Sequence, residues 1–469
     1  MDDPLTTTSQ GSKSPTFRLM DVSSLRALDQ FTEPFDVVIV GGGPSGSACA
    51  YWLAQAGWRV CVVEKKTFPR VKTCGDGLTP RSVHQLRAMG LEEAVAAVGH
   101  RYEGLRAHGF GASLEMSWPE HPVFPHYGYT ITRFDLDGLV ATHAEAHGAT
   151  VLTGVEAIEP LDLVEGGAGR LGSASGVLVQ DKEGVRAEIR GRYLVVADGQ
   201  NSRIGRALGT SRVKEWPMGL ALRGYYRSDR HDEPWIDSHL DIRDPDGRVV
   251  PGYGWIFPLG DGRVNVGVGL LSTAGAWKGV NTTKLQEYFV AQVGADWGLS
   301  EDTSEGPATG GRLPMGLAVG PRVGERTLCV GDAAGSVNPF NGEGIAYGYE
   351  TGRLAAGVLG EALSFEEPGR LSLYEERLDE AYGDYYRVAR AFVRLISEPK
   401  ILQVCVASGL RVKPVMTELL AVMSNLMSNS ERGPAEWGFR AAASLSRVLP
   451  ERAWNAVFKT SDISPTNVG

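Results

Sequence analysis

The segment Phe35–Lys66 constrains the fold more than any other part of the sequence. Its apolar, β-branched run Val37–Val40 predicts a strand that is buried on both faces. Small and apolar residues at helical spacing follow as far as Gly57, and a second apolar run ends at Glu64. The segment therefore predicts a strand, a helix and a second parallel strand, which is the unit of an α/β fold.

The turn between the first strand and the helix carries a glycine pattern. Gly41, Gly43 and Gly46 fit G-x-G-x-x-G, which permits a tight turn and lets a pyrophosphate bind at the helix N-terminus. Glu64, 18 residues after Gly46, can accept hydrogen bonds from ribose hydroxyls. We expect seven residues of this segment to bind a dinucleotide: Gly41, Gly42, Gly43, Pro44, Ser45, Gly46 and Glu64.

Two further glycine-rich segments have different interpretations. Gly167–Gly172 also matches G-x-G-x-x-G, but a strand-like segment follows it, so we interpret it as a hairpin loop. Much later, an apolar strand pattern leads into Asp332, and a helix opens at Gly344 and Ile345. A carboxylate at a strand end can bind a polyol hydroxyl, and a helix N-terminus favours negative charge on a ring. This second segment suits a second contact with a long cofactor, whereas a nicotinamide enzyme would need no further cofactor motif.

Several segments together carry a family resemblance. The fingerprint with Glu64, Thr132–Val140, Val195–Arg206 and Gly331–Gly344 resemble the successive FAD motifs of para-hydroxybenzoate-hydroxylase-like flavoproteins. Within that superfamily, Pro69–Val83 and Pro251–Gly269 resemble the geranylgeranyl reductase family, which saturates isoprenoid double bonds. The likeness runs from about residue 36 to about residue 449.

The resemblance implies FAD as cofactor and assigns roles to further residues. Arg133 would reach the phosphate or ribityl region, Asp332 the ribityl chain, and Gly344 with Ile345 the isoalloxazine end. Asp198 and Gly199 match the aspartate and glycine that lie near FAD and the nicotinamide route in the hydroxylases. The implied electron donor is unidentified, because the sequence has no convincing second dinucleotide fingerprint.

The stretch Cys74, Gly75, Asp76, Gly77 is first of all a turn, because Asp-Gly favours positive φ. The resemblance adds that its glycines let backbone N–H groups approach the flavin and that Cys74 lines the reacting face. A lone thiol is also compatible with inert packing. We therefore expect all four residues to contact the cofactor, with Cys74 a candidate proton donor.

Tyr253, Trp255 and Phe257 alternate, which places them on one face of a strand. By spacing alone they are an ordinary aromatic core face; with the resemblance they are expected to line a prenyl tunnel. Reduction of an unpolarised alkene by flavin hydride also needs a proton on the other carbon. Tyr253, Cys74 or a bound water could supply it, and the sequence does not choose among them.

Composition excludes several classes of protein. A net charge of −9 makes a nucleic-acid partner improbable, and no apolar run is long enough to span a membrane. The five cysteines form no C-x-x-C pair and suit a reducing cytoplasm. No metal is expected: nothing at ligand spacing accompanies Cys74, and His143 with His147 is interpreted as a solvated helix end.

The C-terminal part is basic, with 11 Lys and Arg against 5 Asp and Glu from Tyr385 to Thr460. Arg387, Arg390 and Arg394 stand among apolar residues there. Two interpretations stay open, a helical bundle that covers the core and a surface that meets an anionic membrane leaflet. We expect a cytoplasmic protein held peripherally on the inner face of the membrane.

These observations combine into an α/β, overall α+β, organisation. We expect a tail (1–33), a discontinuous Rossmann-type FAD domain (34–206 and 311–365), an inserted antiparallel-sheet substrate domain (207–310) and a helical C-terminal region (366–469). The resemblance implies reduction of one isoprene unit of the menaquinone tail. The alternatives are reduction of geranylgeranyl diphosphate or a geranylgeranyl lipid, flavin-dependent aromatic hydroxylation, and flavin or lipid carriage without turnover.

Overall fold

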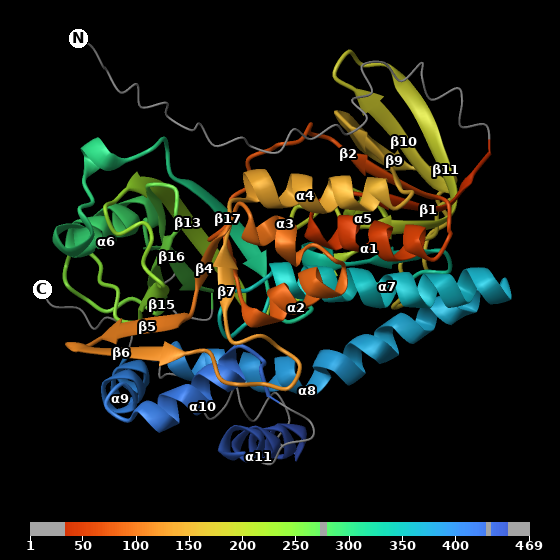
Figure 1. The fold of residues 1–469 in the computed structure, drawn as a ribbon. Helices are drawn as coiled ribbons and strands as arrows, with labels where there is room; N and C mark the ends of the chain where they lie inside the picture. The colour runs from red at the N-terminus through yellow and green to blue at the C-terminus, as the bar shows by residue number, and fades with distance from the viewer. Residues whose placement is uncertain (1–32, 273–278, 428–432, 449–469) are drawn as a thin grey trace, which may run out of the picture.

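The structure is a computed structural model of the 469-residue chain and describes residues 33–272, 279–427 and 433–448. The expected N-terminal tail, except for Glu33, and the last 21 residues of the expected helical region lie outside the described residues. Two large sheets and a set of C-terminal helices make up the fold (Figure 1).

The first sheet contains the predicted strand, helix and strand unit. Its strand order is β8-β2-β1-β11-β10-β9, and β19 pairs with β11. The pairs that involve β1, β2, β8 and β19 are parallel, whereas β9, β10 and β11 form an antiparallel extension. The strands are β1 (Phe35–Val40), β2 (Val60–Glu64), β8 (Thr150–Thr153), β9 (Val155–Pro160), β10 (Gly176–Asp181), β11 (Arg186–Val196) and β19 (Thr327–Cys329).

Three helices pack together beside this sheet. α1 (Pro44–Gln55) lies against both α4 (Arg133–Ala146) and α7 (Ile345–Phe365). The approach of α1 to α7 is close, because a Cβ added at Gly352 would lie 2.4 Å from the carbonyl oxygen of Ser45. The predicted Rossmann-type arrangement is confirmed, and both glycine-rich helix starts belong to it. Short helices α2 (Pro80–Ala88), α3 (Glu92–Ala96) and α5 (Arg203–Ala207) complete this region.

The second sheet has the order β17-β13-β16-β15-β14-β5-β6. Its pairs are antiparallel except for β14 with β5, and α6 (Thr282–Trp297) packs on one face. β5 and β6 lie outside the expected substrate domain 207–310 in the sequence, yet they belong to this sheet. The expected domain boundaries stay a prediction. The strands are β5 (Gly104–Gly109), β6 (Ala112–Ser117), β13 (Met218–Arg227), β14 (Trp235–His239), β15 (Gly252–Pro258), β16 (Arg263–Leu271) and β17 (Thr309–Pro314).

Small sheets and single helical turns connect these layers. β3 pairs with β7, which pairs with β4, and β12 pairs with β18. These elements are β3 (Gly77–Leu78), β4 (His100–Tyr102), β7 (Gly128–Thr130), β12 (Ser211–Arg212) and β18 (Val319–Gly320), with the turns η3 (Glu301–Thr303), η4 (Gly331–Ala334) and η5 (Pro368–Ser372).

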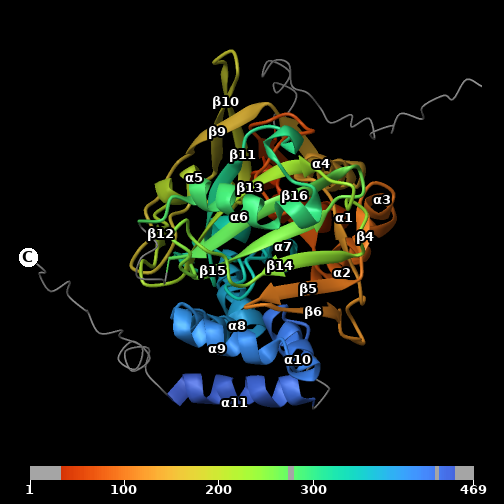
Figure 2. The same cartoon turned by 90° about the vertical axis from the view of Figure 1, so that its left-hand side faces the viewer.

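The C-terminal part is helical, as expected, and its helices lie along one side of the molecule (Figure 2). α8 packs against α7 and α11, and α10 packs against β6. No helix of the described residues is long and apolar enough to cross a bilayer. The helices are α8 (Leu373–Ile396), α9 (Pro399–Gly409), α10 (Lys413–Met423) and α11 (Pro434–Val448).

Candidate cofactor and substrate site

The first glycine turn requires its glycines. Gly41 has a φ of 106°, and a Cβ there would lie 2.3 Å from the carbonyl oxygen of Ala197. A Cβ at Gly46 would lie 1.9 Å from the carbonyl oxygen of Gly41. Neither position tolerates a side chain without movement of the backbone, so the turn holds the N-terminus of α1 tightly against β1 and β11.

Glu64 ends β2 beside this turn. Its Oε2 accepts a hydrogen bond from the backbone N–H of Gly42, and its Oε1 accepts one from Lys66, both at 3.0 Å. Each carboxylate oxygen has a second lone pair, so the side chain can still accept hydrogen bonds from a sugar.

Two guanidinium groups face the start of α1, and the side chains that carry them are each 10% exposed. Arg133 Nε and Nη2 donate to the two Asp137 oxygens at 2.5 and 2.8 Å, and Arg70 Nη2 lies 3.0 Å from Asp137 Oδ2. A Cβ at Gly43 would lie 3.6 Å from Arg70 Nη2 and 4.0 Å from Arg133 Nη2. Arg70 Nε is buried and finds no hydrogen-bond partner in the described part of the chain. The helix N-terminus therefore carries donors and positive charge suited to a phosphate.

The second glycine-rich segment lies beside the first. A Cβ at Gly331, in η4, would lie 2.5 Å from Ser45 Oγ. Asp332 follows it, and a Cβ at Gly344, the N-cap of α7, would lie 3.4 Å from Asp332 Oδ1. Burial raises the pKa of Asp332, and the positive charge of Lys72 opposes that shift. The structure thus brings together residues almost 300 positions apart, and their contact with one cofactor stays a prediction.

The turn from Cys74 to Gly77 is fixed by the second sheet. Asp76 is fully buried with a φ of 64°, and its Oδ2 accepts hydrogen bonds from Tyr225 at 2.6 Å and Asn265 at 2.8 Å. Its Oδ1 accepts one from the backbone N–H of Arg133 at 3.2 Å. Burial raises the pKa of Asp76, and these donors oppose the shift. The carboxylate therefore holds the turn in position.

Cys74 is half-buried in this turn. Its carbonyl oxygen accepts hydrogen bonds from Arg223 Nε at 3.1 Å and Asn265 Nδ2 at 2.9 Å. Burial raises the pKa of the thiol, while the Arg133 guanidinium lowers it. Since the net shift is upward, the group is a neutral thiol at neutral pH.

The aromatic row of β15 (Tyr253, Trp255 and Phe257) faces the same turn. Its ring centroids lie 5.7 and 6.3 Å apart, and the Phe257 ring would lie 3.3 Å from a Cβ at Gly75 and 3.0 Å from one at Gly77. The Tyr253 hydroxyl donates to the carbonyl oxygen of Asn341 at 2.9 Å. Burial raises the pKa of Tyr253 to about 12. Turn, row and second glycine-rich segment therefore meet.

The residues predicted from the sequence for this region do not include Arg70, Arg223, Tyr225 and Asn265. Arg70 precedes the Cys74 turn by only four positions, and a cation so close to that motif was the missed sequence signal. Arg223, Tyr225 and Asn265 alternate on β13 and β16, on the face that carries the aromatic row. Polar residues at alternate positions of otherwise apolar strands could have identified them as facing an occupied site.

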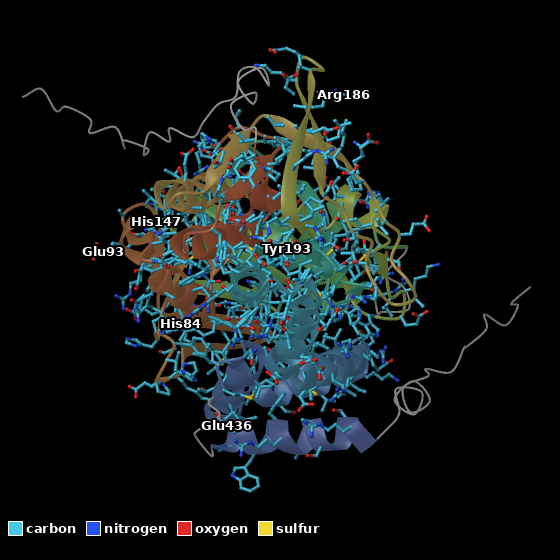
Figure 3. All side chains as sticks on the ribbon, turned by 90° about the vertical axis from the view of Figure 1, so that its right-hand side faces the viewer. His84, Glu93, His147, Arg186, Tyr193 and Glu436 are labelled. Atoms are coloured by element: carbon cyan, nitrogen blue, oxygen red, sulfur yellow. The ribbon has the colours of Figure 1, made fainter. Side chains whose placement is uncertain are left out.

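Other sequence candidates lie elsewhere. His147 is exposed at the end of α4 (Figure 3), whereas His143 is half-buried and stacks on Tyr51 at 4.9 Å. Asp198 Oδ2 accepts the backbone N–H groups of Arg203 and Ile204, at 2.8 and 3.1 Å, and so caps α5.

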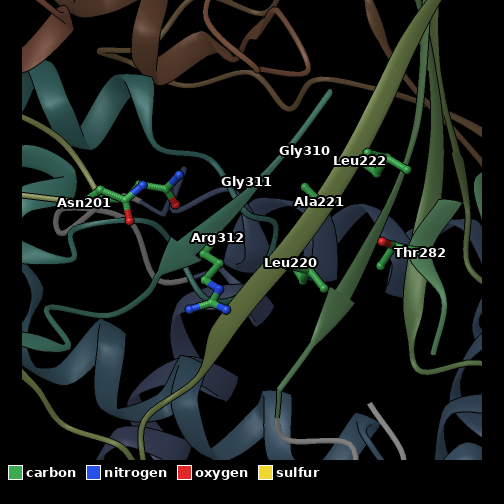
Figure 4. A pocket seen from close by; sticks show the side chains of 9 residues that line it. Asn201, Leu220, Ala221, Leu222, Thr282, Gly310, Gly311 and Arg312 are labelled. Atoms are coloured by element: carbon green, nitrogen blue, oxygen red, sulfur yellow. The ribbon is translucent and has the colours of Figure 1, made fainter. Parts of the chain in front are cut away.

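A cavity of about 390 Å³ lies next to the Asp198 loop, between that loop and strands β13 and β17 (Figure 4). Its walls include Gln200, Asn201, Gly311 and Arg312. Leu220, Ala221 and Leu222 of β13 form its apolar walls.

One cluster of the described residues has metal-ligand types. His108, Asp237 and His239 hold ligand atoms within 4.8 Å of one another. The Asp237 carboxylate already pairs with His108 at 3.0 Å and Arg106 at 3.4 Å. His239 contacts Phe289 of α6, on the sheet face opposite the aromatic row. The cluster is thus separate from the candidate site, and the expectation that this site holds no metal stays a prediction.

Comparison with known proteins gives consistent findings. A family model described as an FAD binding domain matches residues 34–221. The menaquinone reductase of Mycobacterium tuberculosis is 41% identical over 418 residues, which cover 89% of this chain and 97% of that protein. Digeranylgeranylglycerophospholipid reductase 1 of Methanopyrus kandleri is 31% identical, over 79% of this chain and 92% of its own.

Solved structures share the fold. A geranylgeranyl bacteriochlorophyll reductase-like protein from Thermoplasma acidophilum has a TM-score of 0.70 at 21% identity, and the match covers 87% of this chain and 99% of that one. A flavin-dependent brominase has a TM-score of 0.65 at 19% identity, covering 88% and 99%. At these identities the likeness supports the fold and carries no conclusion about the reaction.

Proposed function

This chain belongs to the family of FAD-dependent reductases that includes menaquinone reductase, and we propose that it saturates one isoprene double bond in the menaquinone tail. It is an FAD-dependent oxidoreductase that acts on an isoprenoid C=C bond. The observation that carries the finer proposal is the 41% identity to menaquinone reductase over 97% of that protein's length.

The residues present fit FAD. The turn at Gly41 and Gly46 leaves no space for a side chain, and Arg70 and Arg133 face the helix start where a pyrophosphate would bind. We assign Asp332 to the ribityl hydroxyls and the N-terminus of α7, at Gly344 and Ile345, to the ring end. When bound and reduced, FAD supplies the hydride for the alkene.

We propose that the aromatic row holds the isoprenoid chain next to the Cys74 turn. Apolar walls suit a hydrocarbon and keep water from the reacting carbons. The same sheet face continues through Ile236, which is 6% exposed, to Met116, which is 1% exposed. α9 and α10 pack against this face, with Leu402 and Leu420 in the same apolar cluster. We propose that the isoprenoid tail extends from the aromatic row along this apolar face, toward α9 and α10.

The outer side of α9 and α10 supports our proposal of peripheral membrane binding. We define the α9–α10 surface by its exposed apolar residues and its exposed cations. Val404 is 65% exposed, Val412 47% and Val415 57%. Lys400, Arg411 and Lys413 are exposed among them. Apolar side chains with neighbouring cations suit the interface of an anionic bilayer.

The test uses the purified FAD-loaded chain, reduced anaerobically with dithionite because the physiological electron donor is unidentified. Vesicles carrying menaquinone are added, and mass spectrometry counts the hydrogens gained by the tail. Flavin oxidation alone is insufficient, since reduced flavin can also reduce the quinone ring. A product with one saturated isoprene unit supports the proposal, and an unchanged tail contradicts it.

The Methanopyrus relative favours a second candidate, reduction of geranylgeranyl groups in a phospholipid. Vesicles of a digeranylgeranyl phospholipid, tested in the same way, separate the two substrates. Saturation of the phospholipid but not of menaquinone would transfer the assignment. A hydroxylase would need oxygen and would leave the prenyl chain unsaturated, and a carrier would alter neither substrate.

A further inference from the structure

Glu343 is a half-buried acid to which neither the sequence nor the proposed function assigns a role. It stands between Gly342, where a Cβ would lie 3.3 Å from the Tyr253 hydroxyl, and Gly344, the N-cap of α7. The backbone that carries it therefore passes the end of the aromatic row and the start of the helix assigned to the ring end of FAD.

Its carboxyl group reaches the segment that follows the Cys74 turn. The hydroxyls of Thr79, at 2.5 Å, and Ser82, at 3.0 Å, both donate to Glu343 Oε1. Thr79 is two residues beyond Gly77, where a Cβ would lie 3.0 Å from the Phe257 ring. Glu343 thus links the two backbone segments that flank the aromatic row.

The other carboxyl oxygen, Oε2, is buried and has no hydrogen-bond partner among the residues that the structure describes. An ionised carboxylate with a buried, unpartnered oxygen is costly, whereas a neutral acid keeps its proton on that oxygen as a free donor. Because Oε1 accepts both hydroxyl hydrogens, the geometry places the acidic proton on Oε2.

The charged and titratable neighbours do not remove the preference of Glu343 for its neutral, protonated form. Arg81 of α2 attracts a negative charge on Glu343, but its guanidinium is already paired with Glu350 of α7 at 2.7 Å. Glu350 repels such a charge, and Tyr102 of β4 and Tyr347 of α7 also interact with it. Burial is the largest influence and raises the pKa of Glu343 to about 7.

The other possible donors are less suited. The Tyr253 hydroxyl already donates to the carbonyl oxygen of Asn341, and its pKa is about 12. Burial raises the pKa of the Cys74 thiol above its usual value. A general acid works best when its pKa lies near the operating pH, which Glu343 alone among these three groups satisfies.

We propose that Glu343 is the proton donor of the reduction and that its Oε2–H protonates the alkene carbon that does not receive the hydride. The inference rests on the proposed isoprenoid reduction. The C=C π bond is replaced by two C–H bonds, one formed by the hydride of reduced FAD and one by this proton. The carboxylate that remains takes up a proton from water before the next turnover.

The test compares Glu343→Gln, which keeps an oxygen for Thr79 and Ser82, with Ser82→Ala, which keeps the acid. Single-turnover saturation of the menaquinone tail is followed by acid quenching and mass spectrometry over a range of pH. The wild-type rate should fall as pH rises through about 7, because the protonated form is the donor. Glu343→Gln should be about 100-fold slower or more, without this pH dependence.

Ser82→Ala is the matched control. The Ser82 hydroxyl lowers the pKa of Glu343, so its removal should raise that pKa. The variant should keep its rate at low pH, and the decline should move to higher pH. Glu343 could instead have only a structural role, in which it joins the start of α2 to the loop before α7. In that case Glu343→Gln will match the wild type in rate and pH dependence, which would overturn the assignment.

A second readout is independent of catalysis. Infrared difference spectroscopy of the wild-type holoenzyme should show a protonated carboxylic acid at neutral pH that is missing in Glu343→Gln. Absence of that band would overturn the assignment even if tail reduction is confirmed. A wild-type enzyme that saturates no prenyl chain would instead refute the proposed function, and with it the role of Glu343 as a substrate acid.

Discussion

The Tyr225 hydroxyl donates a 2.6 Å hydrogen bond to Asp76 Oδ2, although the two residues are 149 positions apart. Asp76 sits in the turn that we assign to the flavin, and Tyr225 lies on β13 of the second sheet. The bond therefore couples the FAD-binding region to the sheet that carries the aromatic row.

Tyr225→Phe should lower the free energy of unfolding by about 1.5 to 3 kcal/mol, because it removes a buried hydrogen bond to a carboxylate. Urea unfolding of the FAD-loaded protein measures this change. Tyr288→Phe is the control, since Tyr288 is 40% exposed on α6. Equal free energies of unfolding in the two variants would show that the hydrogen bond from Tyr225 to Asp76 does not stabilise the fold.

The two G-x-G-x-x-G copies should respond differently to alanine. Gly46→Ala places a Cβ 1.9 Å from the carbonyl oxygen of Gly41, so we expect loss of bound flavin absorbance. Gly167→Ala places a Cβ more than 4 Å from any other described residue that could obstruct it, so this variant should bind FAD like the wild type. Retained flavin in Gly46→Ala would refute the assignment of this turn.

Arg70→Met should weaken FAD binding about 10- to 100-fold, since a charge-assisted contact to phosphate contributes about 1.5 to 3 kcal/mol. Flavin fluorescence during titration of the apoprotein measures the affinity. Arg59→Met is the control, because Arg59 is 49% exposed and pairs with Glu33. Unchanged affinity in Arg70→Met would exclude Arg70 from the phosphate site.

The α9–α10 surface predicts a membrane-binding defect. Replacing Val404 and Val415 by aspartate should reduce sedimentation with anionic vesicles severalfold, because each change exchanges apolar contact for repulsion. Val164→Asp is matched in exposure, at 64% against 65% for Val404, and lies on the loop after β9. Equal loss in this control would contradict a specific membrane surface.

Patterns within short segments were sufficient to predict the features that depend on residues close together in the sequence. The glycine turn, Glu64 at the end of β2 and the aromatic row follow from strand and helix periodicity within short segments. The family resemblance then joined the first segment to Asp332 and Gly344. These segments lie side by side in the structure, and their shared cofactor contact stays a prediction.

The sequence could not identify contacts made across the fold. Asn265 binds Trp255, Asp76 and the Cys74 carbonyl at once, and only the packing of β16 against the turn creates that combination. Likewise, the boundaries predicted from the sequence place β5 and β6 in the first domain. Sequence alone does not reveal that β5 pairs in parallel with β14, which lies far along the chain. Glu343 was overlooked because its burial depends on α2.

The most direct test of the central claim is the quinone composition of a menaquinone-making host that lacks its own tail reductase. Expression of the intact chain should produce menaquinone with one saturated isoprene unit, detected by mass spectrometry, and Gly46→Ala should not. Cys74→Ala alongside tests the thiol, since persistence of the product would limit Cys74 to packing. An unchanged quinone pool, despite FAD-loaded protein in the cells, would contradict the account.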